Sequence, residues 1–347
     1  MLPLRQVDET TFALVGNEQL SYRRCANVQS ASACNWLVPL AEADAGQELC
    51  RSCRLNRTIP NLATGENTEY WGAIELAKRR LVSGLLILGL PVKSKVSEDP
   101  ECGLAFDFLE SPEDGSKVFT GHDDGIITLN IAEANDATRE NIRTQMHEPY
   151  RTLLGHLRHE SGHYYWDRLV EGSPSLDAFR NFFGDERADY AAALEKHYAE
   201  GSPSNWPLNF VSGYASSHPW EDWAETWAHY LHMHDALETA AGFRLDTNSV
   251  ELPLDGFSGD VLVEPDDQFL DQLNGWSRFS AVLNEFARSL GQRDFYPFIL
   301  STQSARKLHF VHRVVMAARE PTHSGSAGII SESTASNKEG KFSTCPV

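Results

Sequence analysis

Two histidines and a glutamate, His159, Glu160 and His163, form the pattern with the clearest chemical meaning in this 347-residue chain. Residues four apart on a helix share one face, so the two imidazoles can bind the same Zn²⁺ ion. Glu160 directly follows the first histidine, where its carboxylate can take a proton from an attacking water. We predict a helix over residues 149–170, because its apolar residues recur near helical spacing. The alternative is a pair of surface histidines on an amphipathic helix with a coincidental glutamate.

A catalytic zinc usually has three protein ligands and an open position for water, so a third ligand must come from elsewhere in the chain. A second helix is predicted to start at Pro219, with Glu221 and Glu225 on one stripe. We expect Glu221 to be the third ligand and Glu225 to hydrogen-bond the free ring nitrogen of a ligating histidine. The rival ligands are the nearby histidines His218, His229, His232 and His234. Acidic residues are also favoured in a first helical turn without any metal, because they interact well with the helix dipole.

Together, the His-Glu-x-x-His run and the Glu-x-x-x-Glu run resemble the gluzincin class of zinc metallopeptidases. A metzincin would need a histidine six residues after His163, and Leu169 stands there instead. Gluzincins similar to lethal factor have a tyrosine seven residues before the glutamate ligand, and Tyr214 matches that spacing. The resemblance therefore implies that Tyr214 donates a hydrogen bond to the tetrahedral oxyanion of the substrate. The alternative is a half-buried structural tyrosine.

Longer stretches resemble a bacterial family of zinc-binding metallopeptidases that have an amino-terminal zinc-ribbon segment. These stretches are residues 34–37, 49–55, 77–81 and 148–156. The resemblance covers most of residues 20–320 and implies an α+β fold. In that fold a zincin-like metallopeptidase domain, mostly helical with a small sheet, follows a small cysteine-rich segment. The family pattern begins with an additional Cys-x-x-Cys pair, which residues 1–24 lack.

Four of the six cysteines cluster near the amino terminus and indicate a second metal site. They are Cys25, Cys34, Cys50 and Cys53. In a reducing compartment, clustered thiols that end in Cys-x-x-Cys are more typical of a structural zinc site than of disulfides. A closed tetrahedral site would replace the core that so short a segment lacks. We therefore expect one catalytic and one structural zinc. The alternative for the cysteines is a set of partly buried free thiols in a ribbon that has lost its metal.

We predict three regions along the chain. A cysteine-rich, zinc-ribbon-like segment spans residues 1–62, the zincin-like metallopeptidase domain spans 63–319, and a tail rich in Ser, Thr and Gly is expected to be disordered over 320–347. Within the domain, the first helix starts near Asn67, and we place Lys78, Arg79 and Arg80 on its solvated face.

Short strands are predicted after this helix, and residues 125–131 form the clearest of them. The resemblance to zincins implies that this strand is the sheet edge beside the cleft. An exposed edge can pair with an extended peptide and so position the bond to be cut.

Composition excludes several classes of protein. The net charge of −19 argues against non-specific binding to nucleic acid and to anionic membrane surfaces. The apolar run near residues 85–88 is interrupted by Gly89 and Pro91 and is too short to span a bilayer. No apolar stretch follows Arg5, so we expect no secretory signal and a cytoplasmic location.

These patterns favour a zinc-dependent peptidase that hydrolyses peptide bonds with Glu160 as the general base. The expected partner is a peptide or protein substrate, and the amino-terminal segment is a candidate surface for a protein partner. Two other classes stay open. One is a non-catalytic zinc-binding scaffold or adaptor, and the other is a zinc hydrolase that acts on a non-peptide amide.

Overall fold

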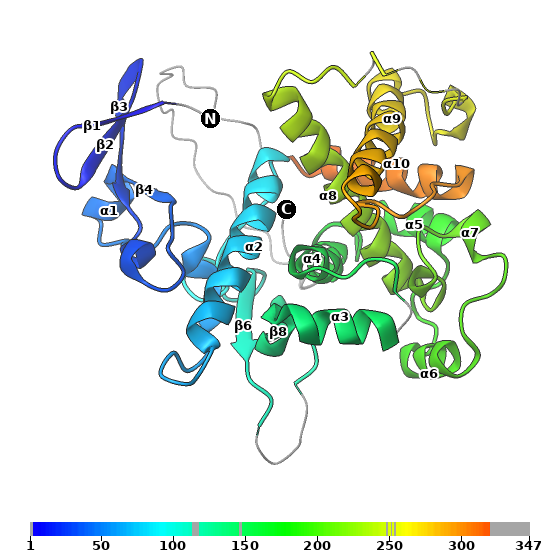
Figure 1. Cartoon of the computed structure of the whole chain (residues 1–347), viewed down its shortest axis with the longest axis horizontal. Helices are drawn as coiled ribbons and strands as arrows, with labels where there is room; N and C mark the ends of the chain where they lie inside the picture. Colours follow the sequence, from blue (N-terminus) through cyan, green and yellow to red (C-terminus); the bar gives the residue numbers. More distant parts are fainter. Residues whose placement is uncertain are drawn as a thin grey trace, which may run out of the picture.

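The computed structural model describes residues 3–112, 118–145, 148–247, 249–250, 252 and 255–319. In these ranges the chain forms a small cysteine-bearing part and a larger, mainly helical part that contains a second sheet (Figure 1). This combination confirms the α+β fold expected from the sequence. The predicted tail at 320–347 lies outside the described residues.

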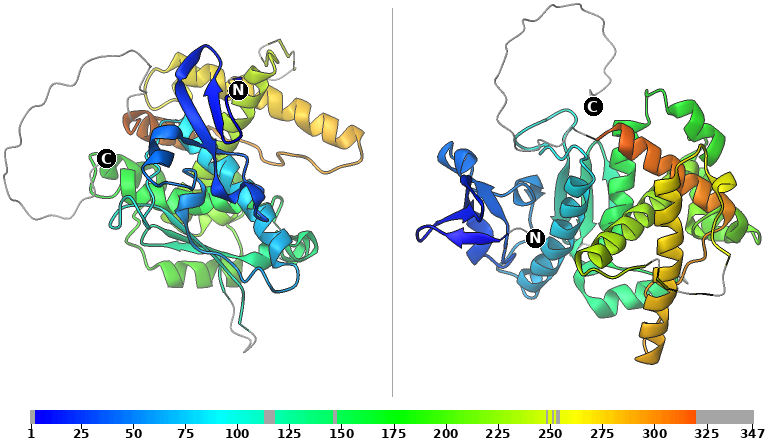
Figure 2. Two further views of the ribbon diagram at one scale, coloured as in Figure 1. Left: turned by 90° about the vertical axis from the view of Figure 1, so that its left-hand side faces the viewer. Right: turned by 90° about the horizontal axis from the view of Figure 1, so that it is seen from above.

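The amino-terminal part is an antiparallel sheet beside the cysteine cluster. Its strands lie in chain order across the sheet and are followed by a short helix: β1 (Leu4–Gln6), β2 (Thr11–Leu14), β3 (Asn17–Arg24), β4 (Leu37–Pro39) and α1 (Leu40–Asp44). Most side chains of β1 and β3 are exposed, so this sheet buries little of its own surface. The buried cluster of this part consists instead of the four cysteines and Val38. This part lies at one end of the molecule in Figure 1 and also when the molecule is seen from above (Figure 2, right).

The larger part contains a mixed four-stranded sheet. Across the sheet its strands are β5 (Asn56–Thr58), β6 (Ala105–Leu109), β8 (Ile126–Asn130) and β7 (Gly121–Asp123). Strand β6 is parallel to β5 and β8, whereas β7 is antiparallel to β8. The two inner strands are rich in aromatic and β-branched residues and bury Phe106, Phe108, Ile127 and Leu129 completely.

The prediction that residues 125–131 form the edge of this sheet was wrong. Strand β8 has neighbours on both sides, and the edge strand next to it is β7. A two-residue turn is the reason, because Asp124 and Gly125 both have positive φ, at 44° and 73°. Such a turn matches the twist of a hairpin, so the chain before it folds back and pairs with β8.

Nine helices of the larger part surround this sheet and one another. They are α2 (Asn67–Ile87), α3 (Asp136–Gln145), α4 (Leu153–Leu169), α5 (Leu176–Phe183), α6 (Tyr190–Glu200), α7 (Trp206–Asn209), α8 (Pro219–Gly242), α9 (Asp267–Ser289) and α10 (Thr302–Ala317), all within the described ranges. None of them has the length and apolar character of a transmembrane span. The helix predicted from residue 149 begins at Leu153 instead. Thr152 is its N-cap, since the hydroxyl of Thr152 accepts a hydrogen bond from the backbone N–H of Gly155 at 2.9 Å.

The solvated face predicted for α2 was also wrong in part. Lys78 and Arg79 are only 0% and 6% exposed, and Arg80 alone of the three faces solvent. The ammonium group of Lys78 donates a hydrogen bond to Glu75 at 2.6 Å and another to Asn56 in β5. A buried charge requires such partners, and here the partners tie α2 to the sheet.

Helices α4 and α8 pack closely because a glycine lies between them. A Cβ atom on Gly162 of α4 would lie 2.8 Å from the Cα of Ala224 in α8. The indole N–H of Trp223 donates to the carbonyl of Gly162 at 2.8 Å, and that of Trp227 donates to the hydroxyl of Ser161 at 3.1 Å. These contacts fix the position of α8 along α4, and this position determines which side chains of the two helices face each other.

Candidate metal and catalytic site

Side chains from α4 and α8 converge on one point. His159, His163 and Glu221 each offer one ligand atom, and these atoms all lie within 4.8 Å of one another. The Nε2 atom of His159 is 3.0 Å from Oε2 of Glu221 and 3.3 Å from Nε2 of His163. The Nε2 atom of His163 is 3.6 Å from Oε1 of Glu221. The structure therefore brings together the three residues that the sequence predicted as ligands.

The donor set fits zinc. Two imidazole nitrogens and one carboxylate are a usual set for a zinc ion that keeps one open position. Burial alone would lower the pKa of His159, but hydrogen bonds with Glu221 and Glu225 raise it well above its usual value. The two carboxylates therefore favour positive charge at this ring. The Oε2 atom of Glu221 is buried, and apart from its 3.0 Å contact with Nε2 of His159 it has no hydrogen-bond partner among the described residues. A proton on Nε2 of His159 can interact with one ligand atom of this group, whereas a divalent cation can be coordinated by all three ligand atoms.

Glu225 orients the first histidine. Its Oε1 atom is 2.7 Å from Nδ1 of His159, and its Oε2 atom accepts a hydrogen bond from the hydroxyl of Ser212 at 2.6 Å. Burial alone would raise the pKa of Glu225, but the hydrogen bond from His159 lowers it, so the carboxylate is ionised. An ionised partner at Nδ1 keeps the proton there and leaves Nε2 to face the other ligands. Ser212 belongs to no motif and could not be found by spacing.

Glu160 points into the same region without a fixed partner. It is 9% exposed, and no described residue forms a hydrogen bond with its carboxylate. Burial raises the pKa of Glu160 to about 7. A carboxyl group with a pKa near neutrality can both accept and return a proton, which is the requirement for a general base.

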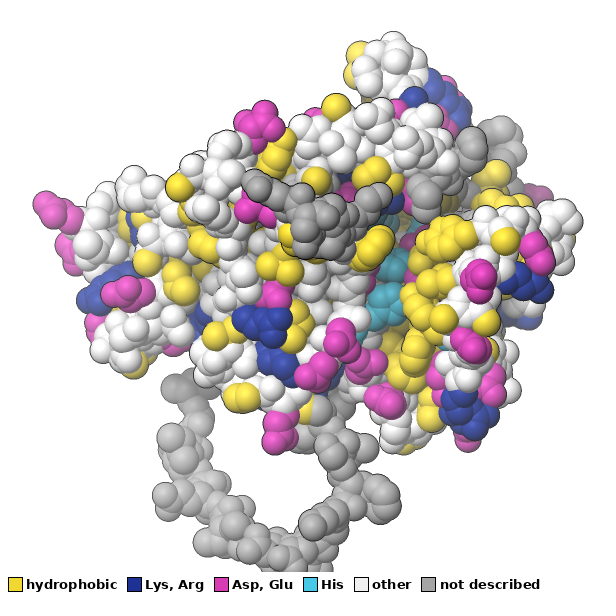
Figure 3. Space-filling model, turned by 90° about the horizontal axis from the view of Figure 1, so that it is seen from below, with side chains coloured by type: hydrophobic (Ala, Val, Ile, Leu, Met, Phe, Trp, Pro, Cys, Tyr) yellow, Lys and Arg dark blue, Asp and Glu magenta, His cyan; other side chains and the backbone are white. Residues whose placement is uncertain are grey.

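Glu160 and the three candidate metal ligands line a cleft of about 350 Å³. The space-filling view shows histidine side chains in a hollow of the surface, with hydrophobic side chains along one side (Figure 3). Strand β7 contributes residues to one wall. The carboxylates of the lining are Asp123, Asp124, Glu160, Asp167 and Glu221, and no lysine or arginine is among the described lining residues.

Two tyrosines also line this cleft. The ring of Tyr214, which was predicted to lie here, is centred 6.0 Å from that of His159. Sequence reasoning missed Tyr190, the first residue of α6, whose hydroxyl donates a hydrogen bond to Oε1 of Glu221 at 2.7 Å. No local pattern marks Tyr190, because only the folded chain brings the start of α6 against α8.

The rival histidines do not join the metal ligands. His218 is the N-cap of α8: its Nδ1 accepts a hydrogen bond from the backbone of Trp220 at 3.2 Å, and its Nε2 donates to the carbonyl of Ala188 at 3.1 Å. The other three, His229, His232 and His234, lie further along α8 and are outside the ligand group.

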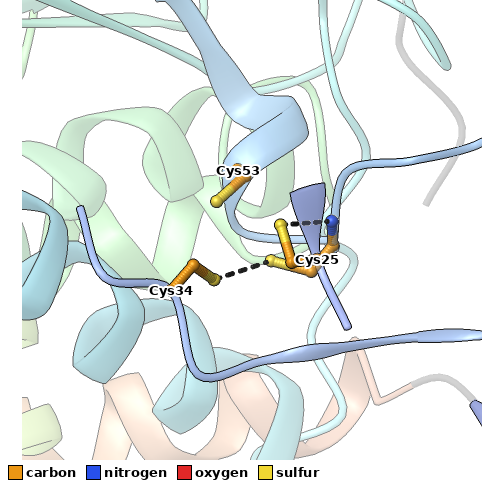
Figure 4. Close-up of side chains that lie close together, drawn as sticks. Cys25, Cys34 and Cys53 are labelled. Carbon is orange, nitrogen blue, oxygen red and sulfur yellow. Dashed lines mark hydrogen bonds between the residues drawn. The ribbon is translucent and has the colours of Figure 1, made fainter. Parts of the chain in front are cut away.

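The four cysteines of the amino-terminal part form a second candidate metal site. One Sγ atom from each lies within 4.8 Å of the others, and all four side chains are buried. The sulfurs of Cys34 and Cys50 are 3.6 Å apart, and the backbone N–H of Cys50 donates to the sulfur of Cys25 at 3.3 Å. In the close-up, the sulfur atoms of Cys25, Cys34 and Cys53 lie close together (Figure 4). Four clustered thiols of this kind fit a closed, structural zinc site.

Comparisons with known proteins match the chain to one family and one domain type. Residues 67–314 match the model of a family described as "Putative zinc-binding metallo-peptidase", and residues 1–64 match a zinc-ribbon domain. Two relatives are "Uncharacterized protein Mb2598c" of Mycobacterium bovis and "Uncharacterized protein Rv2568c" of Mycobacterium tuberculosis. Each is 43% identical over 317 residues, which cover 90% of this chain and 88% of the relative. No solved structure matches the chain significantly.

Proposed function

Because the chain belongs to the putative zinc-binding metallo-peptidase family, we propose that it is a zinc-dependent peptidase with Glu160 as its general base. The observation that carries this proposal is the convergence of His159, His163 and Glu221 beside a cleft that Glu160 also lines. The family match supports zinc and peptidase chemistry at a coarse level. The roles of individual residues are our proposal.

The proposed mechanism assigns one role to the ion and the others to the chain. Zinc held by His159, His163 and Glu221 would lower the pKa of a water molecule towards neutrality and polarise the scissile carbonyl. The carboxylate of Glu160 accepts the proton of the attacking water and then delivers it to the leaving amine. The pKa of about 7 that burial produces at Glu160 suits both transfers.

Three other side chains position the reacting groups. Glu225 holds His159 through Nδ1. Tyr190 donates to Oε1 of Glu221, so Oε2, the oxygen closer to His159, is left for the ion. We propose that Tyr214 donates a hydrogen bond to the substrate oxyanion. Burial and the nearby Glu221 raise the pKa of Tyr214 far above its usual value, so its hydroxyl remains a donor.

The substrate in this proposal is an extended peptide. Among the described strands β7 pairs only with β8, and its residues line the cleft. Its free edge can therefore hydrogen-bond a peptide main chain next to the zinc ligands. We therefore propose β7, in place of residues 125–131, as the edge strand that binds the substrate.

The amino-terminal part has a structural role in this proposal. The zinc-ribbon match and the buried sulfur cluster support one structural zinc held by its four cysteines. We divide the chain into this segment at 1–62 and the peptidase domain at 63–319, a division supported by matches that end at 64 and begin at 67. Contact of the segment with a protein partner and a cytoplasmic location stay predictions.

Digestion of casein and of a peptide library tests the proposal. Zinc-loaded wild type should cleave, whereas Glu160→Gln should keep its zinc and cleave at least about 100-fold more slowly, because a general base contributes about 10²–10⁴ in rate. Glu171→Gln is the matched control, since Glu171 is exposed and lies outside the cleft lining. Cleavage by Glu160→Gln at the wild-type rate would remove Glu160 from the mechanism. If wild type leaves casein and every peptide intact, a non-catalytic zinc-binding scaffold is favoured. If it leaves peptides intact but hydrolyses small amides, a zinc hydrolase of non-peptide amides is favoured.

A further inference from the structure

A second cavity, of about 300 Å³, shares no lining residue with the cleft at the candidate metal site. It lies between α2, α4, α8, α9 and the segment that follows α9. Most of its wall is aromatic or aliphatic, including Leu245, Trp276, Phe279, Leu283, Phe295 and Phe298. Pockets with this size and lining, and with a few polar groups in fixed positions, typically bind small molecules.

The polar groups of this cavity carry an excess of positive charge. Asp235 accepts hydrogen bonds from two guanidinium groups, from Nε of Arg80 at 2.8 Å and from Arg158. Arg158 also contacts Nδ1 of His232. Burial, and then the neighbouring Arg158, lowers the pKa of His232 well below its usual value, so His232 adds no charge. Two arginines and one carboxylate leave one net positive charge, in a chain whose net charge is −19.

Arg80 has a donor available for a ligand. Its Nε and Nη2 atoms are engaged by Asp235 and by the hydroxyl of Thr239, the latter at 2.9 Å. Its Nη1 atom makes no hydrogen bond within the described chain, and its side chain is 47% exposed. Nη1 of Arg80 is thus the guanidinium nitrogen that can donate a charge-assisted hydrogen bond to the carboxylate of a ligand.

The rim of the cavity is unusually apolar for a surface. Phe295 and Leu245, which line it, are 56% and 55% exposed. Large apolar side chains that gather at a concave site are typical of surfaces that a ligand covers. The rim therefore favours a ligand with an apolar body, and Arg80 favours an anionic group at one end of that body.

We propose that this cavity binds a free, medium-chain carboxylic acid. Its carboxylate pairs with Arg80, and its hydrocarbon chain lies against Phe295, Leu245 and the aromatic wall. The cleft at the metal site is lined by carboxylates without a lysine or arginine in its described lining, so the two cavities suit ligands of opposite charge. This binding site is independent of the proposed peptidase activity.

Calorimetric titration of the full, zinc-loaded chain tests the proposal with three probes of equal chain length: octanoate, octanamide and octyltrimethylammonium. Octanoate should bind, and the neutral and cationic probes should bind at least about tenfold more weakly, because they lack the charge-assisted hydrogen bond. Arg80→Gln should weaken octanoate binding about tenfold, whereas Arg80→Lys should keep most of it because the positive charge remains. Phe295→Asp should abolish binding. Leu76→Asp is the matched control, because Leu76 is 65% exposed on α2 and is absent from the lining.

Three results would overturn the proposal. Equal binding of the three probes would mean that the cavity recognises no charge. Wild-type affinity for octanoate in both Arg80→Gln and Phe295→Asp would place the binding elsewhere. Absence of octanoate binding to wild type at millimolar concentration would remove the site altogether.

Discussion

Replacing Gly162 by alanine should separate the two helices that hold the candidate metal site. The added Cβ atom would lie 2.8 Å from the Cα of Ala224, about 0.6 Å short of the 3.4 Å at which ordinary contact begins. Backbone atoms cannot rotate away, so α4 and α8 must move apart. Glu221 is carried by α8 three residues before Ala224, and His163 directly follows Gly162 in α4. The displacement therefore acts directly on the distance between the ligands.

The expected magnitude follows from two opposing effects. Alanine is favoured over glycine in a helix by about 1 kcal/mol, whereas overpacking a close contact costs about 1–3 kcal/mol. Gly84 in α2 is the matched control, because its Cβ would meet nothing within 4 Å. Gly84→Ala should stabilise the chain, and Gly162→Ala should be about 1–3 kcal/mol less stable than Gly84→Ala.

Urea unfolding and competition with a chelator measure the two consequences. Gly162→Ala should lower the free energy of unfolding relative to Gly84→Ala and weaken zinc binding about tenfold, as loss of a supporting contact usually does. Equal stability of the two variants, together with unchanged zinc affinity, would refute the packing argument. Lower stability with unchanged zinc affinity would show that the close contact does not position Glu221.

Three further changes have defined outcomes. Tyr190→Phe should weaken zinc binding about tenfold, because the hydroxyl of Tyr190 positions the ligand Glu221. Tyr198→Phe is the control, since Tyr198 is exposed on the same helix, and it should leave zinc binding unchanged. Equal zinc affinities of the two variants in chelator competition would contradict this role of Tyr190. Cys50→Ser should make residues 1–62 sensitive to trypsin while the helical domain resists, and unchanged resistance of that segment would argue against a structural zinc. The side chain of Asp167 is 45% exposed, but partial burial and then the neighbouring carboxylates raise its pKa from 3.8 to about 7. Between these two pH values the folded chain binds more protons than the unfolded chain, so it loses stability as the pH rises. Asp167→Asn should remove this loss, which thermal unfolding of wild type and variant at pH 5 and pH 8 would measure. An equal change in stability between the two pH values in both proteins would contradict the reasoning.

Sequence spacing predicted the parts of the site that lie on single helices. The four-residue spacing places His159 and His163 on one face whatever surrounds the helix, and the same holds for Glu221 and Glu225. The structure brings the two pairs together, which their spacing alone could not predict. The family match confirms the resemblance to zinc-binding metallopeptidases on which the class of chemistry rested. The catalytic role of each residue remains a prediction.

Contacts between distant segments could not be predicted in this way. Tyr190 and Ser212 approach the site only because the loops around α6 fold against α8, and neither has a local signal. Lys78 resembles any exposed lysine in a charged run, and its burial depends on Glu75 and on Asn56 from another element. The edge strand was misplaced because β7 is too short to show a pattern of its own.

Counting zinc ions per chain tests the central claim most directly. Wild type should hold two zinc ions, and the double variant His159→Ala/His163→Ala should hold one, which stays in the cysteine cluster. Two ions in the double variant, or a wild-type chain that holds zinc only in its cysteines, would contradict the proposed catalytic site.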